Sequence, residues 1–273
     1  MFRRVTLTIV FLLAAAVGVT AQKESKSKEQ PTGTPILWRE PTDITTRDLF
    51  KGPGGDEMRP NLSNVTFVED QSHGYSTNYR VRDASGNIWH AKLGKEAQPE
   101  TASVRLVWAV GYMTEINYLV PCVQIQGAPE PSKEVERCEG KGFANVKFEA
   151  RPKEVKRLDS WSWTQNKFTG TREFQGMLVL MSLLNNWDLK DDNNKILHVK
   201  GENGQDELHY IISDLGTTFG KTGGLFSRNR NSPESYVKTK FVESVEGNKV
   251  KLAYSGKNSG LFKNITVEEV KWI

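Results

Sequence analysis

The best candidates for chemistry lie in one stretch of the chain, Asn185 to Gly216. Asp188 and Asn193 stand in a D-L-K-x-x-N spacing, and Asp214 opens a D-x-G sequence after two isoleucines. Phosphoryl transfer requires positioning and charge neutralisation more than covalent help from the enzyme. One carboxylate can orient the attacking hydroxyl, while an amide and a second carboxylate hold Mg²⁺ through the hard oxygen ligands that this ion prefers. The stretch therefore contains the residue types that phosphoryl transfer needs.

The order of these motifs resembles the catalytic loop and the metal-binding D-F-G of the protein-kinase-like superfamily. The form is the looser one of its atypical branches, such as the HipA-like, spore-coat CotH-like and phosphoinositide-kinase-like proteins. The resemblance covers roughly Val65 to Gly220. It implies an α+β fold of two lobes, a small β-rich N-terminal lobe and a larger, mainly helical C-terminal lobe, with ATP and Mg²⁺ between them.

The resemblance also implies a role for each residue of the motifs. Asp188 would take or orient the proton of the acceptor hydroxyl. Lys190 would neutralise charge on the transferring phosphoryl group. Asn193, or Asn194 if the register differs by one, would bind Mg²⁺ together with Asp214.

Upstream, the resemblance makes Lys92 the lysine that grips the α and β phosphates of ATP, whereas a lysine at the end of a strand could also simply reach solvent. Glu100 is its expected partner, with Glu115 as the alternative. Two departures from the usual kinase pattern stand out. His90 takes the place of a small residue that makes room for adenine, and Asn186-Trp187 replaces His-Arg before the catalytic aspartate. Without that arginine, regulation by a phosphorylated activation loop is not expected.

A polar loop precedes the second predicted strand, where kinase-like folds place a phosphate-covering loop. It includes Gly74, Ser76 and Thr77, whose hydroxyl and backbone N–H groups could bind phosphate oxygens. An ordinary hairpin loop is an equal alternative for this segment.

Apolar periodicity and turn residues predict the elements that position these residues. The expected elements are three strands within Val65–Gly94, a helix from Glu96 to Val110, a strand from Glu115 to Ile125, a helix from Thr171 to Leu184, a hairpin of Lys195–Lys200 with Leu208–Ser213, a mobile loop from Thr217 to Asn231, a helix start at Ser232, two short strands within Val237–Tyr254 and a helix from Thr266. Residues 126–170 are polar, and no chemical role is assigned to them. Their basic residues are expected to form a solvated face: Lys153, Lys156 and Arg157.

Length and composition fit one domain of two lobes or two small domains. The chain has 273 residues, of which 37% are hydrophobic, enough to bury a sizeable core. Residues 1–21 have the pattern of a cleavable signal peptide that ends near Ala21, and residues 22–58 are interpreted as a linker whose later part docks from Trp38. The kinase-like domain would occupy residues 59–273, with the lobe boundary near residue 125.

The signal segment predicts a secreted or periplasmic protein with no stable membrane span after its removal. Cys122 and Cys138 would then meet oxidising conditions, which favour a disulfide over two free thiols. The formal charge is +4, and loss of Arg3 and Arg4 lowers it to +2, too little to indicate a nucleic-acid partner.

The sequence thus predicts an exported atypical kinase that transfers the γ-phosphoryl group of ATP to a hydroxyl of an unknown protein or small molecule. Two alternatives stay open. One is a catalytically inactive kinase-like binding module. The other is an envelope or matrix protein that binds Ca²⁺ through acidic loops, including Asp188, Asp191 and Asp192.

Overall fold

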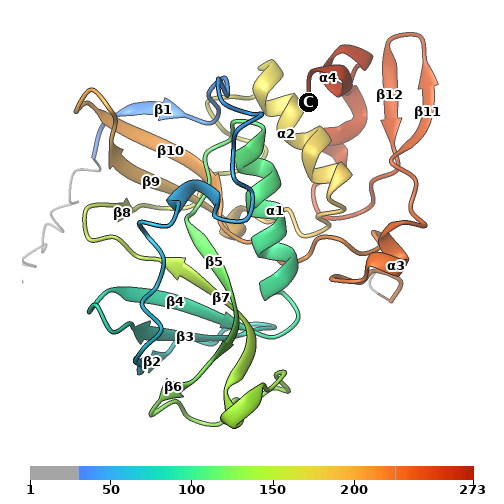
Figure 1. Ribbon diagram of the computed structural model, residues 1–273. Coiled ribbons are helices and arrows are strands. Elements are labelled where there is room, and N and C mark those ends of the chain that lie inside the picture. Colours follow the sequence, from blue (N-terminus) through green and yellow to red (C-terminus); the bar gives the residue numbers. More distant parts are fainter. Residues whose placement is uncertain (1–30, 225) are drawn as a thin grey trace, which may run out of the picture. The chain divides into compact units, whose positions relative to one another are not determined.

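The computed structural model describes residues 31–224 and 226–273, and residues 32–273 form one compact unit. The expected signal peptide, residues 1–21, lies outside the described residues, as does the first part of the expected linker. The described unit has an α+β fold in which strands outnumber long helices (Figure 1).

A six-stranded sheet dominates the first half of the unit. Its strands are β2 (Val65–Asp70), β3 (Thr77–Arg82), β4 (Ile88–Leu93), β5 (Asn117–Val123), β6 (Ile125–Gln126) and β7 (Phe143–Ala150), in the spatial order β5-β7-β4-β3-β2-β6. The expected hairpin is confirmed, because β3 and β4 pair antiparallel from Thr77 opposite Leu93 to Arg82 opposite Ile88. Alternation along β4 buries Trp89 and Ala91 in an apolar cluster on one face of the sheet.

Strand β7 was not expected from the sequence, which left residues 126–170 without an element. It lies between β5 and β4, one strand in from the β5 edge of the sheet. The sheet therefore continues to Ala150, beyond the expected lobe boundary near residue 125. Lys147 and Glu149 interrupt the apolar pattern of this strand, yet both are buried, which requires charged partners that a single strand sequence does not reveal.

Helix α1 (Ala97–Ala109) follows β4 and lies beside β5 and β7 (Figure 1). The helix was expected, and Glu96 proves to be the residue just before it. A buried hydrogen bond of 2.7 Å joins the hydroxyls of Ser103 in α1 and Thr218. The segment after Asp214 therefore helps to fix the helix.

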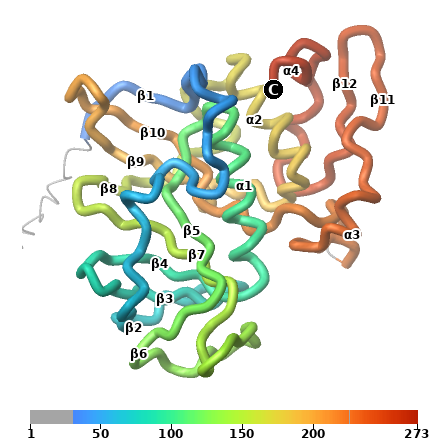
Figure 2. The backbone as a smooth tube through the Cα atoms, in the orientation of Figure 1, coloured from blue at the N-terminus to red at the C-terminus, as the bar shows by residue number. Residues whose placement is uncertain are grey.

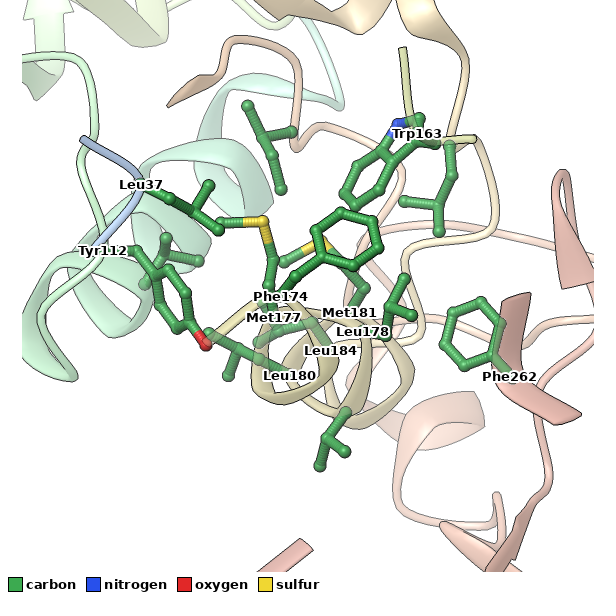
Figure 3. Close-up of a cluster of buried hydrophobic side chains, with 14 of the residues drawn as sticks. Leu37, Tyr112, Trp163, Phe174, Met177, Leu178, Leu180, Met181, Leu184 and Phe262 are labelled. Carbon is green, nitrogen blue, oxygen red and sulfur yellow. The ribbon is translucent and has the colours of Figure 1, made fainter. Parts of the chain in front are cut away.

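Helix α2 (Arg172–Leu183) is the centre of the other apolar cluster and matches the helix expected from its periodicity. Thr171 caps it, because its side chain accepts a hydrogen bond from the Phe174 backbone N–H. Figure 3 shows side chains of α2 between Leu37 and Tyr112 on one side and Phe262 on the other. The helix ends shortly before Asp188 and anchors that loop to the core.

A second sheet is built around the two strands that follow α2 in the chain. Its order is β1 (Thr34–Ile36), β10 (Asp206–Ile212), β9 (Asn194–Lys200) and β8 (Lys156–Arg157). The expected hairpin is confirmed as β9 and β10. Strand β1 pairs parallel with β10, and the tube in Figure 2 shows the two side by side. The segment expected to dock from Trp38 thus joins the fold earlier, at Thr34.

The C-terminal half has less helix than the kinase resemblance implied. After β10 come α3 (Pro233–Tyr236), the hairpin of β11 (Val242–Glu246) and β12 (Lys249–Leu252), a 3₁₀ turn at Ser259–Asn264 and α4 (Val267–Trp272). Further 3₁₀ turns lie earlier in the chain, at Gly52–Gly54, Glu139–Lys141 and Asp191–Asn193. The expectation of a mainly helical C-terminal part is wrong, because among its described residues α2 is the only α-helix longer than six residues. The short strands predicted around Gly247 and the helix predicted after Thr266 are both present.

Cys122 and Cys138 form a disulfide, as expected. The bond joins the end of β5 to the 3₁₀ turn that precedes β7. Among the described residues, no helix is both long enough and apolar enough to cross a membrane.

Candidate functional site

Lys92 lies at the centre of a buried group of charged residues. Its Nζ is 2.6 Å from Glu100 Oε2 and 3.2 Å from Asp214 Oδ1. The pairing with Glu100 that the sequence predicted is therefore confirmed, and Asp214 is a second partner. Burial is the largest effect and by itself lowers the pKa of Lys92, but the two carboxylates outweigh it and raise the pKa above its ordinary value. Lys92 thus stays charged although only 7% of it is exposed.

The loop after α2 brings Asp188, Lys190 and Asn193 together. Asn193 Nδ2 donates a 2.6 Å hydrogen bond to the Asp188 carbonyl oxygen and lies 3.4 Å from its Oδ2. Lys190 Nζ lies 2.8 Å from the same Oδ2. The carboxylate of Asp188 is therefore held by neighbours within the D-L-K-x-x-N sequence itself, as the spacing suggested.

The hairpin of β9 and β10 joins this loop to Asp214. The backbone N–H groups of Ser213 and Asp214 both donate to the Asn193 carbonyl oxygen, over 2.7 and 3.2 Å. The expectation that strand pairing brings Asn193 and Asp214 together is confirmed. Burial by itself raises the pKa of Asp214, but Lys92 and the Gly216 N–H bond outweigh this effect and lower it, so the side chain stays ionised.

A second buried lysine, which the sequence analysis missed, faces the same carboxylate. Lys147 in β7 forms a short ion pair with Glu100 Oε1, so Glu100 binds one lysine through each oxygen. Its Nζ also lies 3.0 Å from Glu149 Oε2. Alternation along β7 puts Lys147 and Glu149 on one face, and register puts Lys147 opposite Lys92. Lys147 can be recognised as a neighbour of Lys92 only once the pairing of β4 with β7 is known.

Arg157 links the sheet to the segment around Asp214. Its Nη2 lies 2.7 Å from Glu115 Oε1 and 2.9 Å from Ser213 Oγ, and Ser213 donates to the same Glu115 oxygen over 2.6 Å. The expectation that Arg157 belongs to a solvated face is wrong. Burial acts most strongly and raises the pKa of Glu115, but Arg157 and two further cations hold it at about 2. Glu115, the alternative partner for Lys92, is thus engaged elsewhere.

Two groups of side-chain oxygens are candidate metal sites. Glu100, Glu115 and Glu149 each offer an oxygen within 4.8 Å of the others. Lys92, Lys147 and Arg157 already pair with these carboxylates, however, so protein cations balance most of their charge. The oxygen left over is Glu115 Oε2, which is buried without a hydrogen bond. Asn193 and Asp214 fit Mg²⁺ better, because the Asn193 amide donates through nitrogen and keeps its oxygen for a metal, and the Asp214 carboxylate is ionised.

His90 shares the charged face of the sheet. Its Nδ1 lies 3.8 Å from Glu149 Oε2. Burial, with the nearby cations of Lys147, Arg151 and Lys92, lowers its pKa to about 3, so the ring is neutral at ordinary pH. Arg80 lies opposite His90 on β3. This face is therefore polar where the kinase resemblance implied space for an adenine ring.

The loop expected to cover phosphates is only partly open to solvent. Gly74 is exposed and has a positive φ of 67°, whereas Ser76 and Thr77 are buried. Thr77 begins β3, and the hydroxyl of Ser76 makes a short hydrogen bond to Glu96 Oε2. Glu96 Oε2 also lies 3.9 Å from Lys92 Nζ. The loop thus approaches the lysine through Glu96, a carboxylate that the sequence analysis did not single out, although it stands four residues after Lys92.

The segment after Gly216 is better anchored than a mobile loop. Thr217 Oγ1 donates to Asn186 Oδ1 over 2.6 Å, and Thr218 is fully buried against α1. Asn186, which stands where the kinase pattern has a histidine or arginine, therefore ties this segment to the loop that carries Asp188.

Neither a protein-family model nor a curated protein sequence matches the chain.

Proposed function

We propose that this protein is an atypical, protein-kinase-like phosphotransferase that uses ATP and Mg²⁺. The observation that carries the proposal is the contact of Lys92 with both Glu100 and Asp214. An ion pair between a strand lysine and a helix glutamate, beside a metal-binding aspartate, is the arrangement that active protein kinases require. Here the three residues come from β4, α1 and the segment after β10.

The proposed two-lobed division has support from the distribution of these elements. The lysine and glutamate belong to the six-stranded sheet and its helix, while Asp188, Asn193 and Asp214 follow α2 and flank the β9–β10 hairpin. ATP would occupy the region where these two sets meet. Bound Mg²⁺ would neutralise charge on the phosphates.

Each residue has a defined task in the proposed reaction. Lys92 binds the α and β phosphates. Asn193 and Asp214 hold the metal, and Asp188 orients the acceptor hydroxyl and accepts its proton. Lys190 already contacts Asp188 and stands ready to neutralise the transferring phosphoryl group. Gly74 and Ser76 would approach the phosphates from the loop before β3. The acceptor is a hydroxyl of a protein or a small molecule.

We further propose that the protein acts outside the cytoplasm, in the periplasm or after secretion. Residues 1–21 have the composition of a signal peptide. The bond between Cys122 and Cys138 is of the kind that persists in oxidising compartments.

A thermal-shift titration of the chain from Gln22 onward tests the function. Mg²⁺ with ATP at a hundred times its dissociation constant should add about 2.7 kcal/mol of stability. The shift should disappear in Asp214→Ala and in Lys92→Met. Asp192→Ala is the matched control, because Asp192 is an exposed aspartate beside Asn193 and should leave the shift intact. Absence of any shift with ATP would contradict the proposal.

One observation favours the inactive binding module as the second candidate. Lys147 and Arg157 neutralise carboxylates around Lys92 without any ligand, so the charged group is also complete as a purely structural network. Nucleotide binding without phosphoryl transfer to any hydroxyl would favour this alternative. A thermal shift with Ca²⁺ alone that is lost in Asp192→Ala would instead favour the calcium-binding envelope or matrix protein.

A further inference from the structure

Arg230 lies where three segments of the candidate site meet. One of its Nη atoms forms a short ion pair with Glu96 Oε1. Its guanidinium also lies over two aromatic rings, 4.1 Å from the ring centre of Tyr75 and 4.9 Å from that of Trp187. Tyr75 belongs to the loop before β3, and Trp187 directly precedes Asp188. Arg230 therefore touches the proposed phosphate-covering loop and the proposed catalytic loop at once.

Arg230 and Lys92 share one carboxylate. Glu96 Oε1 binds the arginine, while Glu96 Oε2 lies 3.9 Å from Lys92 Nζ and accepts the hydroxyl of Ser76. Glu96 is 5% exposed, so this carboxylate is enclosed by its partners. The Glu96 carboxylate thus separates the cations of Lys92 and Arg230. The phosphates of a nucleotide could take its place between them.

The chemistry of an arginine suits this position. A guanidinium offers a planar fork of donors that matches the oxygens of a phosphate group. Its place beside two rings fixes its orientation before a ligand arrives, and the cation–π contacts favour the charged form. A positive charge fixed near a transferring phosphoryl group stabilises the charge of the transition state.

We propose that Arg230 binds the terminal phosphate of the nucleotide, exchanging Glu96 for phosphate oxygens, and so acts as an arginine finger supplied by the same chain. This inference rests on the proposed function. In the transfer step, Asp188 accepts the hydroxyl proton, and the acceptor oxygen forms a bond to the γ-phosphorus as the bond to the bridging oxygen breaks. Arg230 and Lys190 balance the charge on the phosphoryl oxygens without exchanging a proton.

Arg228 provides a matched control. Its guanidinium lies 4.0 Å from the ring centre of the same Trp187. Within the part of the chain that the structure describes, its side chain makes no ion pair or hydrogen bond. Arg228→Gln therefore removes a stacked arginine from the same loop without changing the pair between Arg230 and Glu96.

The test measures dissociation constants by calorimetric titration, first with Mg²⁺ and ATP and then with Mg²⁺ and ADP. Arg230→Gln should weaken ATP binding about 10- to 100-fold, the range for a lost hydrogen bond to a charged group, and leave ADP binding within about twofold. Arg230→Lys should recover part of the loss, and Arg228→Gln should change neither constant. Glu96→Gln should strengthen ATP binding, because the competing carboxylate loses its charge.

The outcomes separate this inference from the proposed function. Wild-type protein that binds ATP, together with equal losses for ATP and ADP in Arg230→Gln or no loss at all, would overturn the role of Arg230 alone. Wild-type protein that binds neither nucleotide would overturn both. Glu96→Gln tests the same exchange of Glu96 for phosphate without changing Arg230. Its result therefore still decides the inference if Arg230→Gln fails to fold.

Discussion

The two faces of strand β7 show how differently burial can be achieved within one element. Phe148 is fully buried among apolar side chains of the six-stranded sheet. Its neighbour Lys147 is 1% exposed, yet it lies between Glu100 and Glu149. The apolar face is held by the removal of hydrocarbon from water, whereas the charged face depends on each ion keeping its partner. The first face stabilises the sheet, and the second supplies the candidate site.

The apolar face should show the largest loss when it is altered. Phe148→Ala should lower the free energy of unfolding by about 4 kcal/mol, because it removes buried hydrocarbon and leaves a cavity. Urea denaturation measures the change. Tyr75→Ala, at an exposed ring outside this cluster, is the control and should cost far less. A loss near 1 kcal/mol for Phe148→Ala would show that this face does not hold the sheet.

The charged face should be nearly as sensitive, for a different reason. Lys147→Met keeps most of the side-chain volume but leaves Glu100 and Glu149 with one cation fewer, which should cost about 3 kcal/mol. Lys153→Met, at an exposed lysine, should cost little. Because the penalty comes from unpaired carboxylates, it should shrink at acidic pH, whereas the penalty of Phe148→Ala should not. A pH-independent penalty would contradict the electrostatic explanation.

The pH dependence of stability should show the contribution of the buried His90. Its pKa in the folded protein is about 3, below the ordinary 6.5, so the unfolded chain takes up the proton first. The stability from this group is complete above pH 6.5 and is lost as pH falls from 6.5 toward 3, by about 1.4 kcal/mol per pH unit. Between pH 7 and 5 the wild type should lose about 2 kcal/mol.

Denaturation of His90→Gln over the same pH range should show a flatter profile. His73→Gln, at an exposed histidine in the loop before β3, should keep the wild-type slope. Glu115 and Asp214 have lowered pKa values and act in the same direction only at more acidic pH. An unchanged slope in His90→Gln would remove His90 as the cause.

The smallest effect should come from a change that touches neither face. Thr171→Ala removes the cap of α2 and should lower stability by about 1 kcal/mol. Thr171→Ser keeps the hydroxyl and should restore most of it. Thermal unfolding measures both. A loss as large as that of Phe148→Ala would mean that capping controls the entire α2 core rather than one helical turn.

Local patterns were sufficient for several elements. Helix α2 shows a clear helical period, β3 and β4 flank a turn sequence, and the carboxylate of Asp188 finds its partners, Lys190 and Asn193, within a few residues. The pairing of Lys92 with Glu100 was also predictable, because the helix directly follows the strand. By contrast, β7 was missed because Lys147 and Glu149 look exposed until their partners are known.

What the sequence determined by itself is the set of chemical groups and their local placement: the aspartates and asparagine of the loop, the strand lysine, the helix glutamate and the cysteine pair. The tertiary structure decided which groups share the buried charge. It placed Lys147 on the other oxygen of Glu100, Arg157 on Glu115, and Arg230 on Glu96. The physical reason is that short-range periodicity reports burial of an element's own face, while ion pairs between distant segments depend on strand order and register, which no single segment encodes.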